Sequence, residues 1–326
     1  MRQSYWTSKL VERSCPACGG DRHHLLSHHM QHDLNLNTVI CMACGFVFTN
    51  PIPEKSIYES FYTDAYADYY GRITPRSAGN FRGKIPEYMR QKLNWISEVR
   101  PLSGQRLLEV GPGRGLFLWC AQQMGAEVIG IEPSRAFFDI LQEDNLPCVF
   151  GPLENYDSEA LGHFDFTLMS HVLEHFYDPN TAFKQARELL KDDGFLILEV
   201  PNILKPFRSL DRYFLRYVHP SNFSRHTLDS FLQKHGFESV FVNEGGVDWR
   251  TPQSLFVIAQ KKKLSTQPPI SPENWNDVFF HLSKYQRTWL RLGRFRWMFY
   301  KLYLKARRLF FRLGRFIKRI LFRAKL

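Results

Sequence analysis

The sequence predicts an α/β fold built on a doubly wound, mostly parallel sheet. Two observations lead to this prediction. An apolar run at residues 107–110 is followed by three glycines spaced two residues apart and by a helical pattern at 116–124, which is typical of a strand that turns tightly into a helix. A second apolar run follows at 127–131. Strand, helix and strand in this order form the unit from which parallel sheets are built.

The charge of the chain is unevenly distributed. All 32 acidic residues lie at or before Asp277, whereas 15 of the 43 lysines and arginines lie at or after Lys284. The net charge of +11 therefore comes from the C-terminal segment. The first 20 residues are polar and broken by charge, and no apolar run approaches the length needed to span a bilayer. These features predict a protein that is made and kept in the cytoplasm.

Residues 1–54 are predicted to form a zinc-ribbon-like module. Two C-x-x-C pairs, each followed by glycine, have the spacing of two knuckles that present four thiolates to one structural Zn²⁺. Disulfides are the competing interpretation, but cytosolic thiols stay reduced. Five histidines between the pairs are not needed as ligands and are expected on a solvated loop. The predicted ligands are Cys15, Cys18, Cys41 and Cys44, and the five histidines are His23, His24, His28, His29 and His32.

Residues 55–104 are predicted to form a helical, aromatic-rich cap. Its aromatic residues have the spacing of a helical core stripe, and some of them are also expected to line an acceptor pocket. They are Tyr58, Phe61, Tyr62, Tyr66, Tyr69 and Tyr70.

Residues 105–260 contain the glycine loop and the predicted nucleotide site. Glycine has no Cβ, so the backbone at Gly111, Gly113 and Gly115 can lie against a ligand, and the following helix offers its N-terminus to that ligand. Glu132 ends the second strand, where a carboxylate can accept both hydroxyls of a ribose. An NAD site would normally show G-x-G-x-x-G, and here the third glycine comes one residue early.

The glycine loop resembles the E-x-G-x-G-x-G loop of class I S-adenosylmethionine-dependent methyltransferases. Further matches follow in order at 131–134, 151–154, 164–166, 171–175 and 190–194. The resemblance implies a Rossmann-like, seven-stranded, mostly parallel sheet that binds S-adenosylmethionine. The donor-binding residues it implies are Glu109, Gly111, Gly113, Gly115, Glu132, Pro133, Leu153, Glu154, Ser170 and His171.

The N-terminal module extends the resemblance. Four cysteines, an aromatic strand, N-P and a tyrosine-rich segment are similar to methyltransferases of bacterial sugar, polysaccharide and secondary-metabolite pathways, including the sugar C-methyltransferases. The stretch 217–224 resembles their H-E-H-x-x-Y-F-S motif, but Tyr217 replaces the first His and Val218 the Glu. This departure favours O-methylation slightly over C-methylation.

Methyl transfer from a sulfonium is an in-line displacement, so the protein aligns donor and acceptor and, for a hydroxyl acceptor, removes a proton. His175 and His219 are the candidate catalytic residues, since histidine titrates near neutrality. Either could instead be a hydrogen-bonded core residue. A metal at His171, Glu174 and His175 is disfavoured, because H-V-L-E-H is not the H-E-x-x-H order.

Residues 261–283 are predicted to be a linker, since three lysines at 261–263 and three prolines between 268 and 272 interrupt any regular element. Residues 284–326 are predicted to form a basic amphipathic helix. Lysine and arginine recur there at three- and four-residue spacing, and apolar residues fill much of the remainder. This pattern favours a helix lying on an anionic membrane surface. Nucleic acid is the alternative partner.

Together these features predict an S-adenosylmethionine-dependent methyltransferase. Its expected acceptor is a sugar or a lipid- or nucleotide-linked glycan intermediate at the cytoplasmic face of the membrane. The alternatives are an RNA- or DNA-directed methyltransferase that grips its substrate with the basic tail, and a non-catalytic methyltransferase-like scaffold. No N-P-P-[YF]-type run follows the fourth strand, which weighs against amine methylation of nucleic acid, and the intact donor loop weighs against the scaffold.

Overall fold

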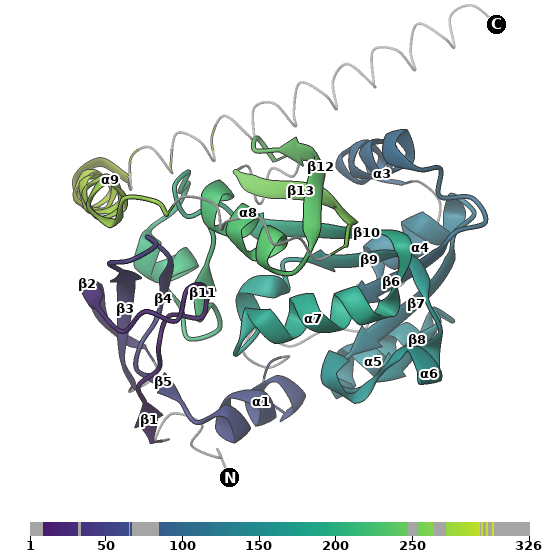
Figure 1. Ribbon diagram of the computed structural model, residues 1–326, viewed down its shortest axis with the longest axis horizontal. Coiled ribbons are helices and arrows are strands. Elements are labelled where there is room, and N and C mark those ends of the chain that lie inside the picture. Colours follow the sequence, from purple (N-terminus) through teal and green to yellow (C-terminus); the bar gives the residue numbers. More distant parts are fainter. Residues whose placement is uncertain are drawn as a thin grey trace, which may run out of the picture.

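The computed structural model describes residues 9–31, 34–64, 66, 85–246, 253–263, 272–293, 295, 298 and 302 (Figure 1). Its centre is a seven-stranded sheet, here called the large sheet, with the order β12-β13-β10-β9-β6-β7-β8. Strands β6 to β10 run parallel, and β13 is antiparallel to both of its neighbours. The strands are β6 (Arg106–Val110), β7 (Glu127–Glu132), β8 (Cys148–Phe150), β9 (Phe164–Ser170), β10 (Leu190–Pro201), β12 (Phe237–Asn243) and β13 (Ser254–Lys261). The predicted doubly wound, mostly parallel, seven-stranded fold is confirmed.

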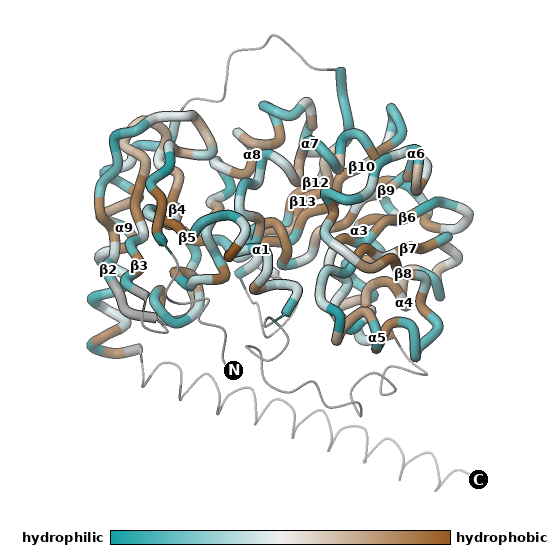
Figure 2. Tube along the Cα trace, turned by 90° about the horizontal axis from the view of Figure 1, so that it is seen from below, coloured by the Kyte–Doolittle hydropathy of each residue, from teal (hydrophilic) through white to brown (hydrophobic). Residues whose placement is uncertain are grey.

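Helices cover both faces of the large sheet. Alternate residues of β10 show why: Phe195 and Ile197 belong to one core cluster, whereas Leu196 and Leu198 belong to the other. Helices α3 (Glu87–Val99) and α4 (Leu116–Gln123) pack on the first face, and α7 (Pro179–Leu189) and α8 (Arg225–Lys234) pack on the second. Figure 2 shows hydrophobic residues concentrated along these central strands. Helix α5 (Arg135–Glu143) lies against β7 and β8, and the short helix α6 (Ser158–Leu161) contacts α7.

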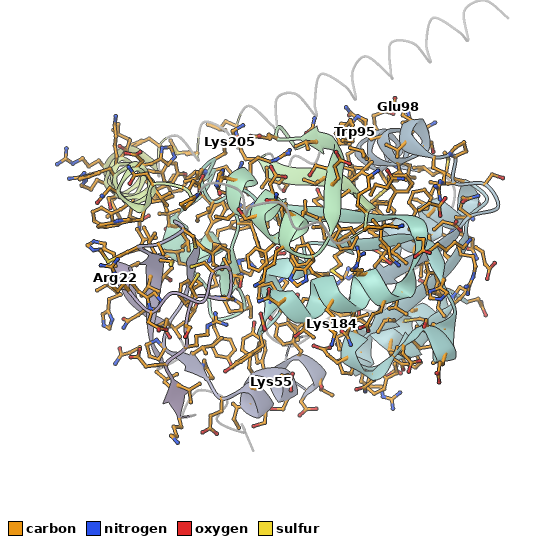
Figure 3. The ribbon with its side chains drawn as sticks, viewed as in Figure 1. Arg22, Lys55, Trp95, Glu98, Lys184 and Lys205 are labelled. Carbon is orange, nitrogen blue, oxygen red and sulfur yellow. The ribbon has the colours of Figure 1, made fainter. Side chains whose placement is uncertain are left out.

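Helix α3 differs from the predicted cap. Its buried residues Leu93 and Ile96 belong to the core under the large sheet, and the ring of Trp95 packs at a tilt against Phe241 and Phe256. Glu98 on the same helix is exposed (Figure 3). Of the described residues between 55 and 104, those that line the ligand cavity described below belong to α1 (Lys55–Asp64) or to Tyr66 just after it. Helix α3 therefore belongs to the packing of the large sheet rather than to a cap. Tyr69 and Tyr70 lie outside the described residues.

The cysteine module forms a second, four-stranded sheet, here called the ribbon sheet. It contains β2 (His23–Gln31), β3 (Leu34–Cys41), β4 (Val47–Thr49) and β11 (Ser221–Asn222), and a separate pair joins β1 (Leu10–Val11) to β5 (Ile52–Pro53). Strand β11 comes from the segment that follows the large-sheet strand β10, and it pairs with β4. The module is thus built from two distant stretches of chain.

The predicted histidine loop is wrong, because four of its five histidines lie in β2. Pairing of β2 with β3 gives the backbone groups of this stretch their hydrogen-bond partners, which outweighs its polar composition. His24 packs its ring against Trp275 and Phe279. His32 lies outside the described residues.

The predicted linker is also corrected, since α9 (Trp275–Thr288) and a short π-helical turn η6 (Trp289–Gly293) begin within or just after it. Beyond the last proline, Asn274 caps the helix by accepting from the backbone N–H of Asn276. Val278 and Leu282, four residues apart, are buried against the ribbon sheet. Of the predicted basic helix, only 284–293 and single positions beyond are described. No helix among the described residues is both long and apolar enough to cross a bilayer.

Candidate functional site

A cavity of about 590 Å³ opens at the carboxyl ends of β6, β7 and β9. This edge of a parallel sheet is where open α/β folds bind ligands. Helix α1 closes the cavity from the side of the cysteine module, and the turns after β7 and β8 close the opposite side. Its lining includes Tyr58, Tyr62, Tyr66, Gly111, Gly113, Arg114, Glu132, Pro133, Phe137, Leu153, Glu154, Asn155, His171, Val172 and His175.

The three glycines of the loop have different roles. All three have positive φ, of 62°, 56° and 70° for Gly111, Gly113 and Gly115. A Cβ on Gly113 would meet no atom within 4 Å, so this position faces open space, as a ligand cradle requires. A Cβ on Gly115 would lie 2.5 Å from Leu146 and 2.6 Å from Leu141, and Gly115 does not line the cavity. Gly115 therefore serves helix packing rather than direct ligand contact.

Glu132 stands at the end of β7 beside the glycine loop. Its Oε2 accepts from the backbone N–H of Gly113 and its Oε1 from that of Ser134, both at 2.9 Å. Burial raises the pKa of Glu132 to about 7, although these two hydrogen bonds act to lower it. The carboxylate is thus held in place at the cavity wall.

Glu109 lies one strand away and is almost completely buried. The pKa of its carboxyl is raised to about 8, chiefly by burial, and the charge of Glu132 acts in the same direction. Among the described residues, Oε2 of Glu109 has no hydrogen-bond partner. Glu109 does not line the cavity. The structure therefore places this predicted donor residue behind the cavity wall rather than on it.

Ser170 is likewise behind the wall, and it leads to a buried ion network that sequence reasoning missed. Ser170 Oγ donates to Glu199 Oε2 at 2.6 Å. The ammonium of Lys92, from α3, lies 2.7 Å from Glu199 Oε1. Burial alone would raise the pKa of Glu199, but the positive charges of Lys92 and His171 hold this pKa well below its usual range. The sequence feature that could have predicted this network is Glu199, an acid within the apolar run that forms β10.

His171 lines the cavity in an unusual backbone conformation, with φ of 56°. Its backbone N–H donates to the carbonyl of Glu199 at 2.7 Å. Nδ1 lies 3.4 Å from Glu174 Oε1 and Nε2 lies 3.7 Å from Glu199 Oε1. Burial would lower the pKa of His171, but the two carboxylates raise it to about 9. This imidazole is consequently a cation near neutral pH and does not accept a proton there.

The two predicted catalytic histidines come together on the α1 side of the site. The rings of His175 and His219 have centroids 4.8 Å apart. His175 Nδ1 donates to the carbonyl of Val218 at 2.5 Å, and the Tyr62 hydroxyl lies 3.1 Å from the same nitrogen. Burial lowers the pKa of both histidines, that of His219 well below its usual value. His175 lines the cavity and His219 lies behind it.

The cysteine cluster is a separate site. The Sγ atoms of all four predicted ligands lie within 4.8 Å of one another, with Cys15 and Cys44 at 3.7 Å and Cys18 and Cys41 at 3.5 Å. Thiolates about 2.3 Å from a tetrahedral ion lie about 3.8 Å apart, so the cluster has the size of such a site. Arg13 lies two residues before Cys15. Its guanidinium donates hydrogen bonds to the backbone carbonyls of Tyr177 and Pro220, so it ties the cysteine module to the rest of the chain.

The segment 81–241 matches a family model described as a methyltransferase domain. The match covers the glycine loop, both central acids and the histidine motif. Together with the seven-stranded sheet, the match supports the predicted class I S-adenosylmethionine-dependent methyltransferase domain in this part of the chain.

Individual relatives match shorter stretches. A ubiquinone biosynthesis O-methyltransferase of Bordetella avium is 30% identical over 118 residues, which cover 34% of this chain and 49% of that protein. The mitochondrial protein of the same name from Bos taurus is 28% identical, covering 45% of this chain and 42% of its own. The magnesium protoporphyrin IX methyltransferase of Synechocystis, with bound S-adenosylhomocysteine, overlaps with a TM-score of 0.48 at 17% identity, covering 64% of this chain and 100% of that one. The chain spans about half the length of the sequence relatives it matches.

Proposed function

We propose that this protein transfers the methyl group of S-adenosylmethionine to a hydroxyl oxygen of its acceptor. The observation that carries the proposal is the cavity at the strand ends, where Gly113 faces open space and Glu132 is held by two backbone amides. The two sequence relatives described above are named O-methyltransferases, which supports oxygen as the acceptor atom. The bound donor supplies an electrophilic methyl group on its sulfonium.

Each part of the site has a role in this proposal. Glu132 accepts the ribose hydroxyls, and the backbone of Gly111 and Gly113 lies against the donor. Leu153 and Glu154, on the turn after β8, line the opposite wall. Tyr62 of helix α1 and His175, which it contacts, lie on the side from which the acceptor enters. The domain therefore aligns the two reactants and excludes water, which is the main contribution that a methyltransferase makes.

Calorimetry with S-adenosylhomocysteine tests the donor site. The wild-type chain should bind one equivalent, and Gly113→Arg should abolish binding because its side chain fills the cradle. Lys184→Arg, an exchange on the outer surface of α7, is the matched control and should bind normally. Normal binding by Gly113→Arg would contradict the site.

The four cysteines are proposed to hold one structural Zn²⁺. The distances between their Sγ atoms support this, as do the left-handed turns at Gly19 and Gly45 that follow each pair. Metal analysis should find an ion that Cys41→Ser loses, while donor binding persists. A wild-type chain that is fully folded without any metal would exclude this role.

The acceptor is proposed to be a sugar or a lipid- or nucleotide-linked glycan intermediate, used at a membrane surface. Helix α9 and η6 support the membrane part of this proposal. Phe280, Leu290 and Leu292 expose 62%, 72% and 55% of their surface. Lys284, Arg287 and Arg291 lie on the same segment, next to these apolar residues. Exposed apolar side chains beside cations are typical of segments that bind anionic bilayers.

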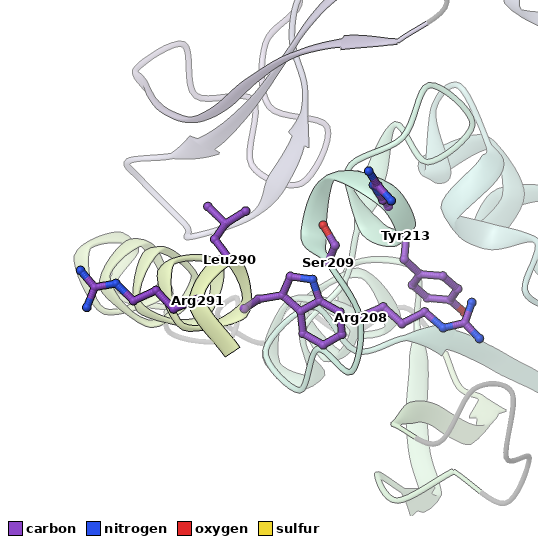
Figure 4. Close-up of a pocket in the computed structure, with 7 residues that line it drawn as sticks. Arg208, Ser209, Tyr213, Leu290 and Arg291 are labelled. Atoms are coloured by element: carbon purple, nitrogen blue, oxygen red, sulfur yellow. The ribbon is translucent and has the colours of Figure 1, made fainter. Parts of the chain in front are cut away.

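A second cavity, of about 580 Å³, lies between η6 and the short π-helical element η5 (Leu210–Phe214). Arg208 lies beside Tyr213, with its guanidinium carbon 5.0 Å from the ring centroid, whereas Leu290 and Arg291 point away from this pair (Figure 4). Ser209, Arg212 and Trp289 complete the lining. A cationic, aromatic pocket at the base of the apolar segment is suited to a phosphate headgroup.

Vesicle sedimentation of the full chain tests the membrane proposal. Binding to anionic vesicles should fall at least about tenfold in Leu290→Glu with Leu292→Glu, since charge then replaces the apolar contact. Val240→Glu, which changes an exposed apolar residue of β12, is the matched control. Vesicle binding that survives the double substitution, together with tight RNA binding, would favour a nucleic-acid substrate instead.

A further inference from the structure

A second cluster of metal-ligating side chains lies beside the donor cavity. Glu174 and His175 belong to η4 (Leu173–His175), and His219 comes from the loop before β11. One ligand atom from each lies within 4.8 Å of the other two. Glu174 is 2% exposed, and its Oε2 has no hydrogen-bond partner among the described residues. The other oxygen, Oε1, faces His171 Nδ1 at 3.4 Å, so Oε2 is the atom left for a further partner, and an unpartnered buried carboxylate oxygen is costly.

The two histidines are prepared as ligands by bonds on their far sides. His175 donates Nδ1–H to the carbonyl of Val218, and His219 hydrogen-bonds the backbone of Phe214. Each bond occupies one ring nitrogen and leaves the other ring nitrogen for a ligand. Carbonyl partners of this kind fix the tautomer and orientation of metal-ligating histidines.

His171 is not part of this cluster. Both of its ring nitrogens face carboxylates, those of Glu174 and Glu199. The pair suggested by the sequence, His171 with His175, is therefore replaced in space by His175 with His219. The new pair could not be read from local spacing, because its members are far apart along the chain.

We propose that Glu174, His175 and His219 bind a divalent transition-metal ion beside the methyl donor. Two imidazoles and one carboxylate form a ligand set that binds zinc or iron and leaves coordination positions open. Ligand atoms about 2.1 Å from one ion lie roughly 3 to 4 Å apart, so the three side chains must close by about an ångström on binding. Because His175 lines the donor cavity, the open positions face the acceptor side.

This inference rests on the proposed methyl transfer and narrows its acceptor to compounds with vicinal hydroxyls. The two oxygens of such an acceptor would occupy the open positions. The ion acidifies one hydroxyl, whose proton passes to solvent water. The resulting oxygen anion forms a bond to the methyl carbon as the carbon–sulfur bond breaks, and sulfur keeps the electron pair.

Metal counting on the full chain after saturation with Co²⁺ tests the site. We expect two ions per chain, of which only the cysteine-bound ion gives intense thiolate charge-transfer absorption. Glu174→Gln and His219→Gln should each weaken the second ion by at least about a hundredfold and leave the thiolate bands intact. Cys41→Ser should show the reverse pattern. His235→Gln, a half-buried histidine that contacts Asn180, is the matched control and should retain two ions.

Two outcomes would overturn the inference: a wild-type chain that saturates at one ion, or a Cys41→Ser chain that binds none. Both outcomes are metal counts on the wild-type chain or on Cys41→Ser, so neither depends on whether Glu174→Gln folds. Calorimetry with S-adenosylhomocysteine separates this inference from the proposed function. Donor binding with one ion would leave methyl transfer standing without the second metal, whereas two ions without donor binding would leave the metal site standing alone.

Discussion

Donor affinity should depend on pH through Glu132. In the donor-free protein, burial raises the pKa of this carboxyl to about 7. Ribose hydroxyls donate hydrogen bonds, so they require the ionised carboxylate. At pH 6 about one molecule in eleven has Glu132 ionised, and at pH 8 about ten in eleven. The dissociation constant should therefore fall roughly tenfold from pH 6 to pH 8, which corresponds to about 1.4 kcal/mol.

The stability of the donor-free protein should change in the opposite direction. A carboxyl whose pKa is raised on folding stabilises the folded protein at pH values below the pKa it has in the unfolded chain, which is near 4.3 for glutamate. This stabilisation is lost as the pH rises through the folded-state pKa of about 7. Glu109, with a pKa of about 8, has the same sign and extends the loss upward. Between pH 5 and 8 the two groups together should cost a few kcal/mol of unfolding free energy. Donor binding strengthens over the same interval.

The assay is calorimetric titration with S-adenosylhomocysteine at pH 6, 7 and 8, in two buffers of different ionisation enthalpy. Binding at pH 6 should release close to one proton. Glu132→Gln should bind S-adenosylhomocysteine weakly, with the same affinity at every pH. Any pH dependence that arises from titration of the ligand would remain in this variant, so the comparison isolates the contribution of Glu132. Glu109→Gln tests the neighbouring acid and should keep most of the slope. A wild-type affinity that is independent of pH, or an equal slope in Glu132→Gln, would refute the reasoning.

Three further results are expected. Gly113→Ala should lower the free energy of unfolding by only about 1–2 kcal/mol, because alanine is strained in this left-handed backbone conformation. Gly115→Ala should lower it more, because its Cβ also meets two leucines. Chemical denaturation measures both losses, and equal losses would contradict the division of roles. Lys92→Met should destabilise the protein by about 3–5 kcal/mol, since it leaves Glu199 buried beside a single cation; a loss under 1 kcal/mol in the same assay would show that the network is not structural. Chelator should remove the ion of Cys41 and lower the melting temperature, and a melting curve unchanged by chelator would argue against a structural metal.

Features that are local in sequence could be predicted, and features that depend on distant contacts could not. The glycine loop and Glu132 lie within one β-α-β unit, so residue spacing alone fixes their meeting. Gly115 matched the same motif, but its packing against Leu141 and Leu146 depends on the following helix and is invisible in the spacing. The partner of Glu199 is Lys92 on α3, and no local pattern joins them.

Helix α9 shows a related limit. The lysines and prolines that precede it predict a linker, yet the stretch after the last proline has a capping residue and an apolar pair, Val278 and Leu282, that packs on the ribbon sheet. The burial surface for that pair exists only once β3 has formed. Tertiary contact therefore decided an element that local propensity left open.

The pairing of β11 with β4 limits how this protein can be recombined with its relatives. A chimera cut at residue 54 would separate β4 from its partner strand and leave the carbonyls of Tyr177 and Pro220 without the guanidinium of Arg13. Because β11 directly follows His219, a foreign cysteine module would also alter the position of that imidazole. The module and the loop that carries His219 should therefore be inherited together, and exchanges that preserve folding should carry both stretches as one unit.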